Sequence, residues 1–183
     1  KESSAASDVY KRQMINMANV KFGGNPVNLL GTQVKIGDKA PSFELVKNDL
    51  SAFKSDELKG KVVIYSVVPS IDTEVCSLQT KFFNKKVTEL SNDVVVVTIS
   101  EDLPFAQGRF CAAEGIDRVI VASDYQKREF GEKYGFMMEG LMLLARGIVV
   151  VDKTGVIKHV EYVPEVTHEV NFDAALAAVK ELV

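Results

Sequence analysis

Residues 62–76 read VVIYSVVPSIDTEVC, and this stretch decides the fold that the sequence predicts. Residues 62–68 form a nearly unbroken β-branched run, which is typical of a central parallel strand covered on both faces. Pro69 ends that strand. From Thr73 onward the apolar residues fall on one stripe of a helix, and they are Val75, Leu78, Phe82, Phe83, Val87 and Leu90. The stretch therefore predicts a strand, a tight turn and a helix over 73–90, with Cys76 in its first turn.

The start of this helix suits an anion. With Thr73 as the N-cap, Cys76 is at position N3, on the same side of the first helical turn as the Thr73 side chain. The unpaired N–H groups and the helix dipole favour a thiolate there. Asp72 and Glu74 oppose a second negative charge, so the site needs a cation from elsewhere in the chain. Position alone leaves open the alternative that Cys76 is a small core residue.

Strands and helices alternate along the rest of the chain. The apolar run 94–99 predicts a second buried strand, and strand–helix–strand is a right-handed βαβ unit in nearly all cases. The other predicted elements are a hairpin within 20–34, an edge strand 43–46, a loop or helical turn 55–60, a helix 104–114 with Asp102 available to cap it and Gly115 ending it, a strand 118–122, a helix 125–134 ended by Gly135, a strand 148–151, a turn 152–155, a strand 156–162 and a helix 172–182. This order predicts an α/β, thioredoxin-like fold: a central mixed sheet flanked by helices, with an N-terminal β-hairpin.

Composition limits the classes of partner. The chain has 183 residues, of which 46% are hydrophobic and 26% charged, enough for one domain with a sizeable core. A net charge of −3 gives no reason to expect nucleic acid or anionic lipid, and no apolar run reaches the 18 residues or so of a membrane span. We expect residues 1–13 to be a non-native or disordered leader and residues 14–183 to form a single domain.

The chain has two cysteines, Cys76 and Cys111. A zinc site would need histidines at metal-ligand spacing, whereas His159 and His168 are expected in a strand and a loop, so we expect no metal and no cofactor. A structural disulfide would suit a small secreted protein, but this chain has core enough without one. The pattern favours a redox-cycling pair.

Three stretches resemble one known family. The spacing P-x-x-x-T-x-x-C over 69–76 resembles the active-site signature of the peroxiredoxins. Residues 102–111 (DLPFAQGRFC) and 144–152 (LARGIVVVD) are similar to the bacterial thiol peroxidase branch of that family, in the same order. The resemblance runs from about Asn19 to the C-terminus. Glu74 stands where that branch more often has a small residue, and Gly147 where it more often has alanine.

The resemblance implies roles for five residues. Cys76 would be the peroxidatic nucleophile and Arg146 the cation that faces its sulfur. Pro69 would shield the sulfur and Thr73 would position the peroxide, in addition to their local roles as strand end and N-cap. Cys111 would be the resolving cysteine, in an intrachain Cys76–Cys111 disulfide. Without the resemblance, Arg146 reads as a solvated charge, and core packing is the alternative for Cys111.

The same resemblance implies partners. Hydrogen peroxide and organic hydroperoxides would be the substrates, thioredoxin the reductant, a homodimer the assembly and the cytoplasm the compartment. Because cysteines on separate helices are often too far apart to bridge, we expect the first turn around Cys76 and the Cys111 helix to unravel locally on oxidation.

The sequence leaves other functions open. A non-enzymatic thiol/disulfide sensor or interaction module would use the same two cysteines without turnover. A thiol–disulfide oxidoreductase is disfavoured because no C-x-x-C follows the central strand. The Met- and Leu-rich stretch 136–144 is favoured as core, with a substrate rim or a dimer interface as the alternatives.

Overall fold

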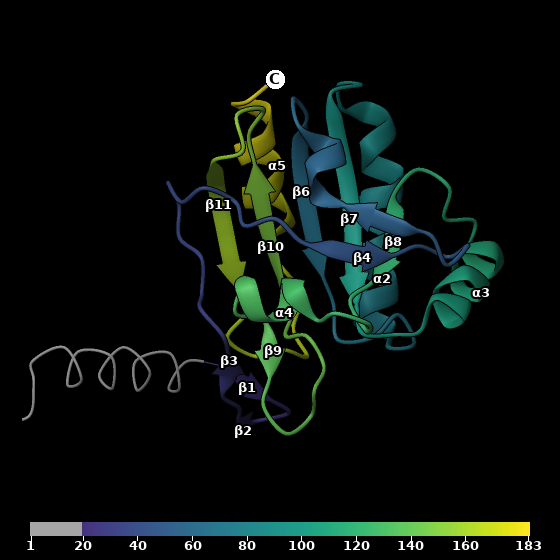
Figure 1. The fold of residues 1–183 in the computed structure, drawn as a ribbon, viewed down its shortest axis with the longest axis vertical. Helices are drawn as coiled ribbons and strands as arrows, with labels where there is room; N and C mark the ends of the chain where they lie inside the picture. Colours follow the sequence, from purple (N-terminus) through teal and green to yellow (C-terminus); the bar gives the residue numbers. More distant parts are fainter. Residues whose placement is uncertain (1–19) are drawn as a thin grey trace, which may run out of the picture.

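The structure is a computed structural model that describes residues 20–183 (Figure 1). The leader expected at residues 1–13 therefore lies outside the described residues. Among residues 20–183, no helix is both long and apolar enough to cross a membrane.

A seven-stranded mixed sheet forms the centre of the molecule. Its strand order is β11-β10-β6-β7-β8-β4-β5, and β6, β7 and β8 are parallel while β10 is antiparallel to β6. The strands are β4 (Glu44–Val46), β5 (Ala52–Lys54), β6 (Val62–Val67), β7 (Val94–Ser100), β8 (Ile120–Ser123), β10 (Gly147–Val151) and β11 (Ile157–Tyr162). The predicted central strand is β6, which is buried along its whole length. It lies in the middle of a mixed sheet, so the prediction of a thioredoxin-like α/β fold is confirmed.

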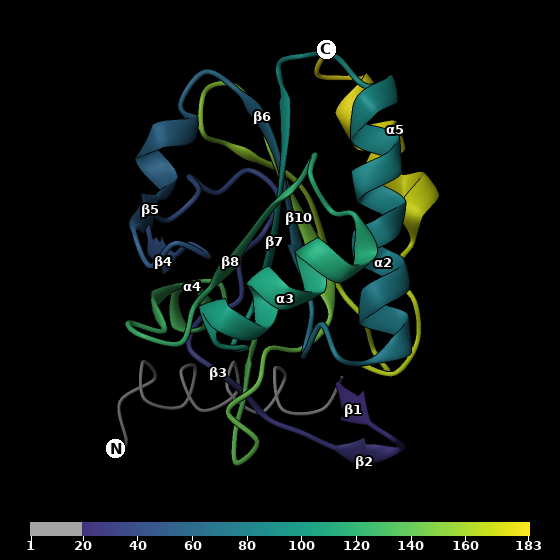
Figure 2. The same cartoon turned by 90° about the vertical axis from the view of Figure 1, so that its right-hand side faces the viewer.

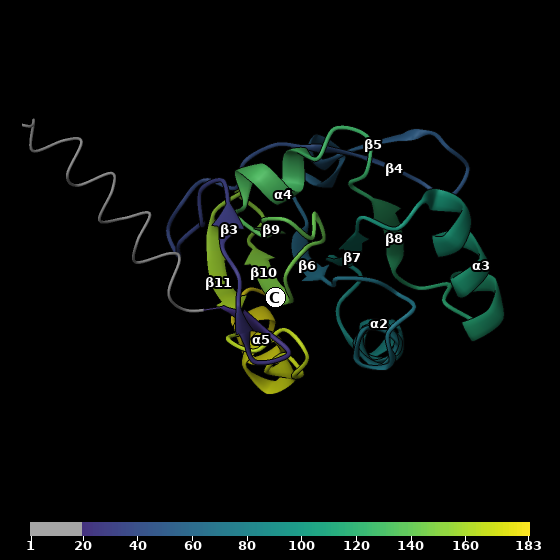
Figure 3. The ribbon, with the colours of Figure 1, turned by 90° about the horizontal axis from the view of Figure 1, so that it is seen from below.

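Helices cover both faces of this sheet. They are α2 (Glu74–Lys86), α3 (Pro104–Glu114), α4 (Glu129–Lys133) and α5 (Phe172–Lys180), with 3₁₀ turns η1 (Ser55–Leu58) and η2 (Val87–Glu89). Figure 3 shows α2 and α5 together below the sheet, α4 above it and α3 beside β8. The helix predicted over 73–90 is thus an α-helix that tightens into η2 in its last turn.

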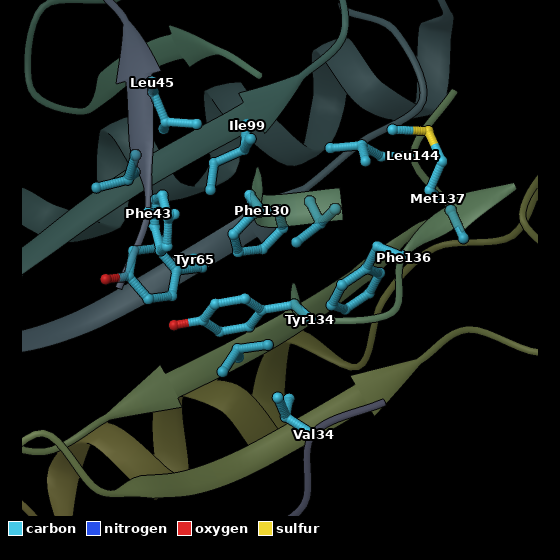
Figure 4. Packing of buried hydrophobic residues seen from close by; sticks show 14 of the residues in the cluster. Val34, Phe43, Leu45, Tyr65, Ile99, Phe130, Tyr134, Phe136, Met137 and Leu144 are labelled. Carbon is cyan, nitrogen blue, oxygen red and sulfur yellow. The ribbon is translucent and has the colours of Figure 1, made fainter. Parts of the chain in front are cut away.

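Alternate residues of β6 face two different cores, as the two-residue period of a strand requires. Val62 and Ile64 pack with Phe83 of α2 and Val179 of α5. Val63, Tyr65 and Val67 belong to the other core, which is rich in aromatic rings. In that core the Phe43 ring lies edge-on to Tyr65 and to Phe130, with centroids 5.2 and 5.0 Å apart (Figure 4).

The N-terminal hairpin is confirmed as β1 (Lys21–Phe22) paired with β2 (Asn25–Pro26). It lies at one end of the molecule, near the short pair β3 (Leu29–Leu30) and β9 (Met137–Met138) (Figures 1 and 2). The Glu165 carboxylate accepts the N–H groups of Gly23 and Gly24. Hydrogen bonds from Thr167, Gly24 and Gly23 hold the pKa of Glu165 at about 2. This carboxylate fixes the hairpin to the segment after β11.

Two local predictions were wrong. Asp102 does not cap α3. The N-cap is Leu103, which forms no side-chain bond, because the Asp102 carboxylate accepts hydrogen bonds from Ser70, Ile71 and Ser100 instead.

The helix predicted over 125–134 is shorter in the structure and begins only at Glu129, as α4, because the Arg128 backbone is left-handed, with φ 55°. Asp124 takes the N–H groups at the start of α4. Gly135 ends that helix as predicted, with φ +69°.

The Met- and Leu-rich stretch divides into two parts. Phe136, Met137, Met138 and Leu144 are fully buried, as the core interpretation predicts. Leu141 and Met142, at the tip of the loop between them, are exposed. The tip is therefore the only part of this stretch that is available for a partner or a substrate.

Candidate active site

The turn between β6 and α2 presents Cys76 at the helix start. Thr73 is the N-cap, and its Oγ1 atom accepts the Cys76 backbone N–H at 3.3 Å. The same hydroxyl donates to the Ser70 carbonyl at 3.3 Å, which closes the turn on itself. Pro69 is buried where β6 ends, whereas Thr73 is exposed. The sequence prediction of a capped helix with cysteine at N3 is confirmed.

Asp102 holds this turn from the next strand. Its carboxylate accepts the Ser70 hydroxyl at 2.8 Å, the Ile71 N–H at 2.9 Å and the Ser100 hydroxyl at 2.6 Å. β7 and β6 are parallel neighbours, so their carboxyl ends meet at one edge of the sheet and bring residues 70 and 102 together. The sequence suggested Asp102 only as a helix cap. Its position at the end of the second parallel strand was the signal that could have revealed this contact.

Arg146 reaches the Cys76 sulfur from the start of β10, the strand next to β6. It immediately precedes β10, whose first residue pairs with Val67 at the end of β6. Its Nη2 atom lies 3.1 Å from the Cys76 Sγ atom, and its side chain is fixed by two further bonds, from Nη1 to the Gln79 Oε1 atom at 3.0 Å and from Nε to the Val166 carbonyl at 2.8 Å. Arg146 is only 2% exposed and Cys76 is fully buried. The cation that the sequence required is therefore present.

Gln79 is a site residue that sequence reasoning missed. It lies in α2 three residues after Cys76, on the same face of the helix, and is 1% exposed. Its Nε2 atom donates to the Ser66 hydroxyl at 2.8 Å while its Oε1 atom accepts from Arg146. The available signal was a glutamine three residues after Cys76, on the same side of the helix. Gln79 locks the guanidinium to both the helix and the central strand.

A guanidinium and a helix N-terminus converge on one sulfur, and both are groups that bind anions. A charged group this deeply buried is tolerated because each of its nitrogens has a partner. The same fixed donors would also stabilise negative charge that develops on an oxygen bound next to the sulfur. The arrangement suits a thiolate that attacks a small electrophile.

Cys111 lies apart from this cluster, in the second half of α3. It is half-buried beside the core under α2. The Asn48 amide reaches its sulfur at 3.9 Å. Burial raises the pKa of the Cys111 thiol, and the Asn48 amide opposes that rise. Both cysteines are free thiols, on helices joined through the Lys81–Glu114 ion pair at 2.6 Å.

Comparison with known proteins now defines the family. Residues 35–176 match the family model described as Redoxin. The chain belongs to the Redoxin family. A thiol peroxidase of Oceanobacillus iheyensis is 52% identical over 161 residues, 88% of this chain and 98% of that protein. A thiol peroxidase of Bacillus subtilis is 47% identical over 167 residues, 91% and 99% of the two chains.

Solved structures of Redoxin-like proteins agree with the fold. A peroxiredoxin-like protein from Aquifex aeolicus superimposes with a TM-score of 0.85 and 42% sequence identity, covering 90% of this chain and 97% of that one. These relatives confirm the resemblance to the peroxiredoxins, in their thiol peroxidase branch.

Proposed function

We propose that this protein is a thioredoxin-dependent thiol peroxidase that reduces hydrogen peroxide and organic hydroperoxides. The observation that carries the proposal is the contact between the Arg146 guanidinium and the Cys76 sulfur at the start of α2, at 3.1 Å. A buried cysteine without such a cation is inert, whereas a thiolate held by fixed donors is a strong nucleophile. The thiol peroxidase relatives support the same activity.

In the first step the Cys76 thiolate attacks one peroxide oxygen. An S–O bond forms and the O–O bond breaks, so Cys76 becomes a sulfenic acid while the leaving oxygen takes a proton and departs as water or an alcohol. Arg146 donates to the charge that develops on the oxygens. The hydroxyl of the exposed Thr73, which accepts the Cys76 N–H, orients the peroxide, and the buried Pro69 offers no competing N–H. These are the roles that we assign to the four residues.

In the second step the Cys111 sulfur attacks the Cys76 sulfenic acid: an S–S bond forms, the S–O bond breaks, and the hydroxide leaves as water with the proton of the Cys111 thiol. Cys76 is fully buried and Cys111 half-buried on another helix, so the two sulfurs need local unfolding to meet. The segments that must open are the first turn of α2 and the second half of α3. Amide exchange of the reduced and oxidised forms tests this step: weaker protection in both segments after oxidation supports it, and equal protection contradicts it.

In the third step a reduced dithiol protein, thioredoxin, attacks the disulfide, returns both cysteines to thiols and leaves as a disulfide. A cycle that depends on such a reductant needs a compartment that keeps thioredoxin reduced, and we therefore assign the protein to the cytoplasm. The net reaction consumes one hydroperoxide and one reduced dithiol. It releases one alcohol (or water, from hydrogen peroxide), one water and one oxidised dithiol.

We also propose a homodimer. Large apolar side chains are exposed on the elements that carry the two cysteines, with Leu78 on α2 and Leu103 and Phe105 at the start of α3. Phe105 is 68% exposed, which is unusual for a ring with no partner to cover it. In analytical ultracentrifugation, Phe105→Glu should shift the protein toward monomer, whereas the matched control Ile36→Glu, on an exposed side chain elsewhere, should not. A dimer that survives Phe105→Glu unchanged would contradict this interface.

Peroxide-dependent NADPH consumption, coupled through thioredoxin and its reductase, tests the activity. Wild type should turn over, Cys76→Ser should be inactive, and Cys111→Ser should be inactive with thioredoxin but active with dithiothreitol, which resolves the sulfenic acid directly. Circular dichroism of each variant checks that it is folded. If wild type forms the disulfide once and never cycles with any dithiol, a redox sensor replaces the peroxidase as the better function.

A further inference from the structure

A cavity lies at the end of the sheet opposite to Cys76. It measures about 490 Å³ and is walled by the segment before β4, by η1, by the start of β6 and by the turn after β10. Val63 of β6 and its partner Val151 of β10 line it, whereas Arg146 precedes Gly147 at the other end of β10. Four residues of strand, at about 3.3 Å each, separate Gly147 from Val151 by roughly 13 Å. The cavity is therefore separate from the Cys76 site.

Positive charge predominates around this cavity. Four lysines line it, Lys39, Lys59, Lys61 and Lys153, against two aspartates. Lys61 and Lys153 share one further carboxylate, Asp93, at 3.4 and 3.0 Å. Lys39 and Lys59 form no ion pair with any described residue.

The two aspartates do not cancel this charge. The Asp152 carboxylate is occupied by the turn after β10, where it accepts the N–H groups of Thr154 and Val156. Asp56 faces the same opening as Lys59 and forms no ion pair within residues 20–183. Even with Asp93 included, lysines outnumber carboxylates around the cavity, so an anion is the ligand that it attracts.

The Tyr65 hydroxyl supplies an independent sign of a ligand. Tyr65 is 3% exposed, and its ring packs in the aromatic core while its hydroxyl points away from that core (Figure 4). This hydroxyl lines the cavity and makes no hydrogen bond with residues 20–183. By contrast, the neighbouring Tyr134 hydroxyl donates to the Pro41 carbonyl at 2.7 Å. The Tyr65 hydroxyl is not among the buried polar atoms that lack a partner, so it reaches the open space of the cavity, where it is free to donate to a ligand.

Burial, with the negative charge of the nearby Asp56 as the second cause, raises the pKa of Tyr65, which keeps this hydroxyl protonated. Val63, Leu58 and Pro41 supply apolar lining, and Ser42, Ser55 and Thr154 supply hydroxyl groups. A volume of about 490 Å³ is in the range of small-molecule sites, which combine apolar walls with a few convergent polar groups.

We propose that this cavity binds a small amphipathic organic anion, a carboxylate or a phosphate monoester with a short apolar body. An oxygen of its head group accepts the Tyr65 hydroxyl, Lys39 and Lys59 neutralise its charge, and the apolar body packs on Val63 and Leu58. This site does not depend on the peroxidase cycle, because none of these residues contacts Cys76 or Arg146.

Calorimetric titration of the reduced protein tests the proposal with three probes: octanoate, phenyl phosphate and inorganic phosphate. We expect saturable one-site binding of octanoate, of phenyl phosphate or of both, and the tighter of the two identifies the head group. The double variant Lys39→Gln/Lys59→Gln should weaken that binding roughly tenfold or more, and Tyr65→Phe roughly fivefold, as loss of charge-assisted and neutral hydrogen bonds predicts. Tyr65→Phe keeps the ring packing, so its fold should be intact.

The matched control is Lys85→Gln/Lys180→Gln, which removes two exposed lysines from α2 and α5 and should leave binding unchanged. Peroxide turnover should be the same in all these variants. Absence of saturable binding for both organic probes at millimolar concentration would overturn the proposal. So would binding that survives both cavity variants, or inorganic phosphate that binds as tightly as phenyl phosphate, since the apolar walls would then contribute nothing.

Discussion

The Arg146 Nη2 atom lies 3.1 Å from the Cys76 Sγ atom, although 70 residues separate the two in the chain. The sheet creates this contact, because β10 runs antiparallel to β6 and both the cysteine helix and the arginine are attached to the same end of that strand pair. Gln79 and the Val166 carbonyl hold the guanidinium in place. The geometry therefore exists before any substrate binds, which is what electrostatic preorganisation requires.

Arg146→Lys should slow the reaction of Cys76 with hydrogen peroxide. A lysine has one nitrogen and cannot serve the sulfur, Gln79 and the Val166 carbonyl at once. We expect a loss of roughly 100-fold, the lower range for removal of a fixed donor to a developing anion. Acid-quenched samples, analysed by mass spectrometry for oxidised Cys76, give the rate. Arg118→Lys, on an exposed arginine, is the control, and equal rates for the two variants would refute the role of Arg146.

Asp102→Asn should loosen the turn that carries Cys76. The amide offers one acceptor oxygen where the carboxylate now accepts from Ser70, Ile71 and Ser100. We expect the free energy of unfolding to fall by about 1–3 kcal/mol, since hydrogen bonds to a charged acceptor are lost, and the peroxide rate to fall with it. Urea denaturation measures the first effect. Asp117→Asn, at an exposed position, should change neither quantity, and an unaltered peroxide rate in Asp102→Asn would show that the turn is held by other contacts.

Gly147→Ala tests how tightly β10 packs beside Arg146. A Cβ atom at Gly147 would lie 2.1 Å from the Glu161 carbonyl oxygen and 2.5 Å from the Phe136 ring. The backbone of β11 must move to admit it, so we expect a loss of about 1–3 kcal/mol or more in the free energy of unfolding. The matched control is Gly108→Ala in α3, where the nearest atom would be 3.7 Å away. This helix position should gain up to about 1 kcal/mol, and a neutral Gly147→Ala would show that the two strands separate easily.

The sequence alone predicted the part of the site that is local in the chain, the turn from β6 to Cys76. It did not predict the contacts that distant residues make with that turn. The β-branched run of β6 and the Thr73 cap are local signals, and both predictions held because the residues involved are close in the chain. The Arg146 contact needed the resemblance, because an arginine before a strand carries no local sign of its partner. Gln79 and Asn48 were missed for the same reason: each acts on a residue that only the fold brings near.

The wrong local predictions also have physical causes. The pattern over 125–134 is helical, but the Asp124 carboxylate takes the N–H groups of Phe130 and Gly131 and delays the helix start to Glu129. The short strands β5 and β9 were not predicted, because two or three residues carry too little periodicity to stand out. β5 forms by pairing with β4, and β9 by pairing with β3, so these two strands become evident only in the fold.

Glu101→Gln should change how stability depends on pH. Glu101 lies beside Asp124. Both of its carboxyl oxygens are buried, and neither forms a hydrogen bond with a described residue. Burial, with the neighbouring Asp124 carboxyl as the second cause, raises the pKa of Glu101 to about 9. Its ordinary pKa is about 4.3, so between these values the folded protein binds a proton that the unfolded chain does not.

The sign of the effect follows from that excess proton. The contribution of Glu101 to stability is fully present below its unfolded pKa and is lost as the pH rises toward about 9. Glutamine keeps the shape of the protonated acid and cannot ionise, so Glu101→Gln should gain stability relative to wild type as the pH rises from 5 to 9. Urea denaturation at several pH values measures this difference, with the exposed Glu181→Gln as the control. Parallel pH profiles for wild type and Glu101→Gln would mean that Glu101 is already ionised at neutral pH and is held by Arg128, the one cation whose charge favours that form.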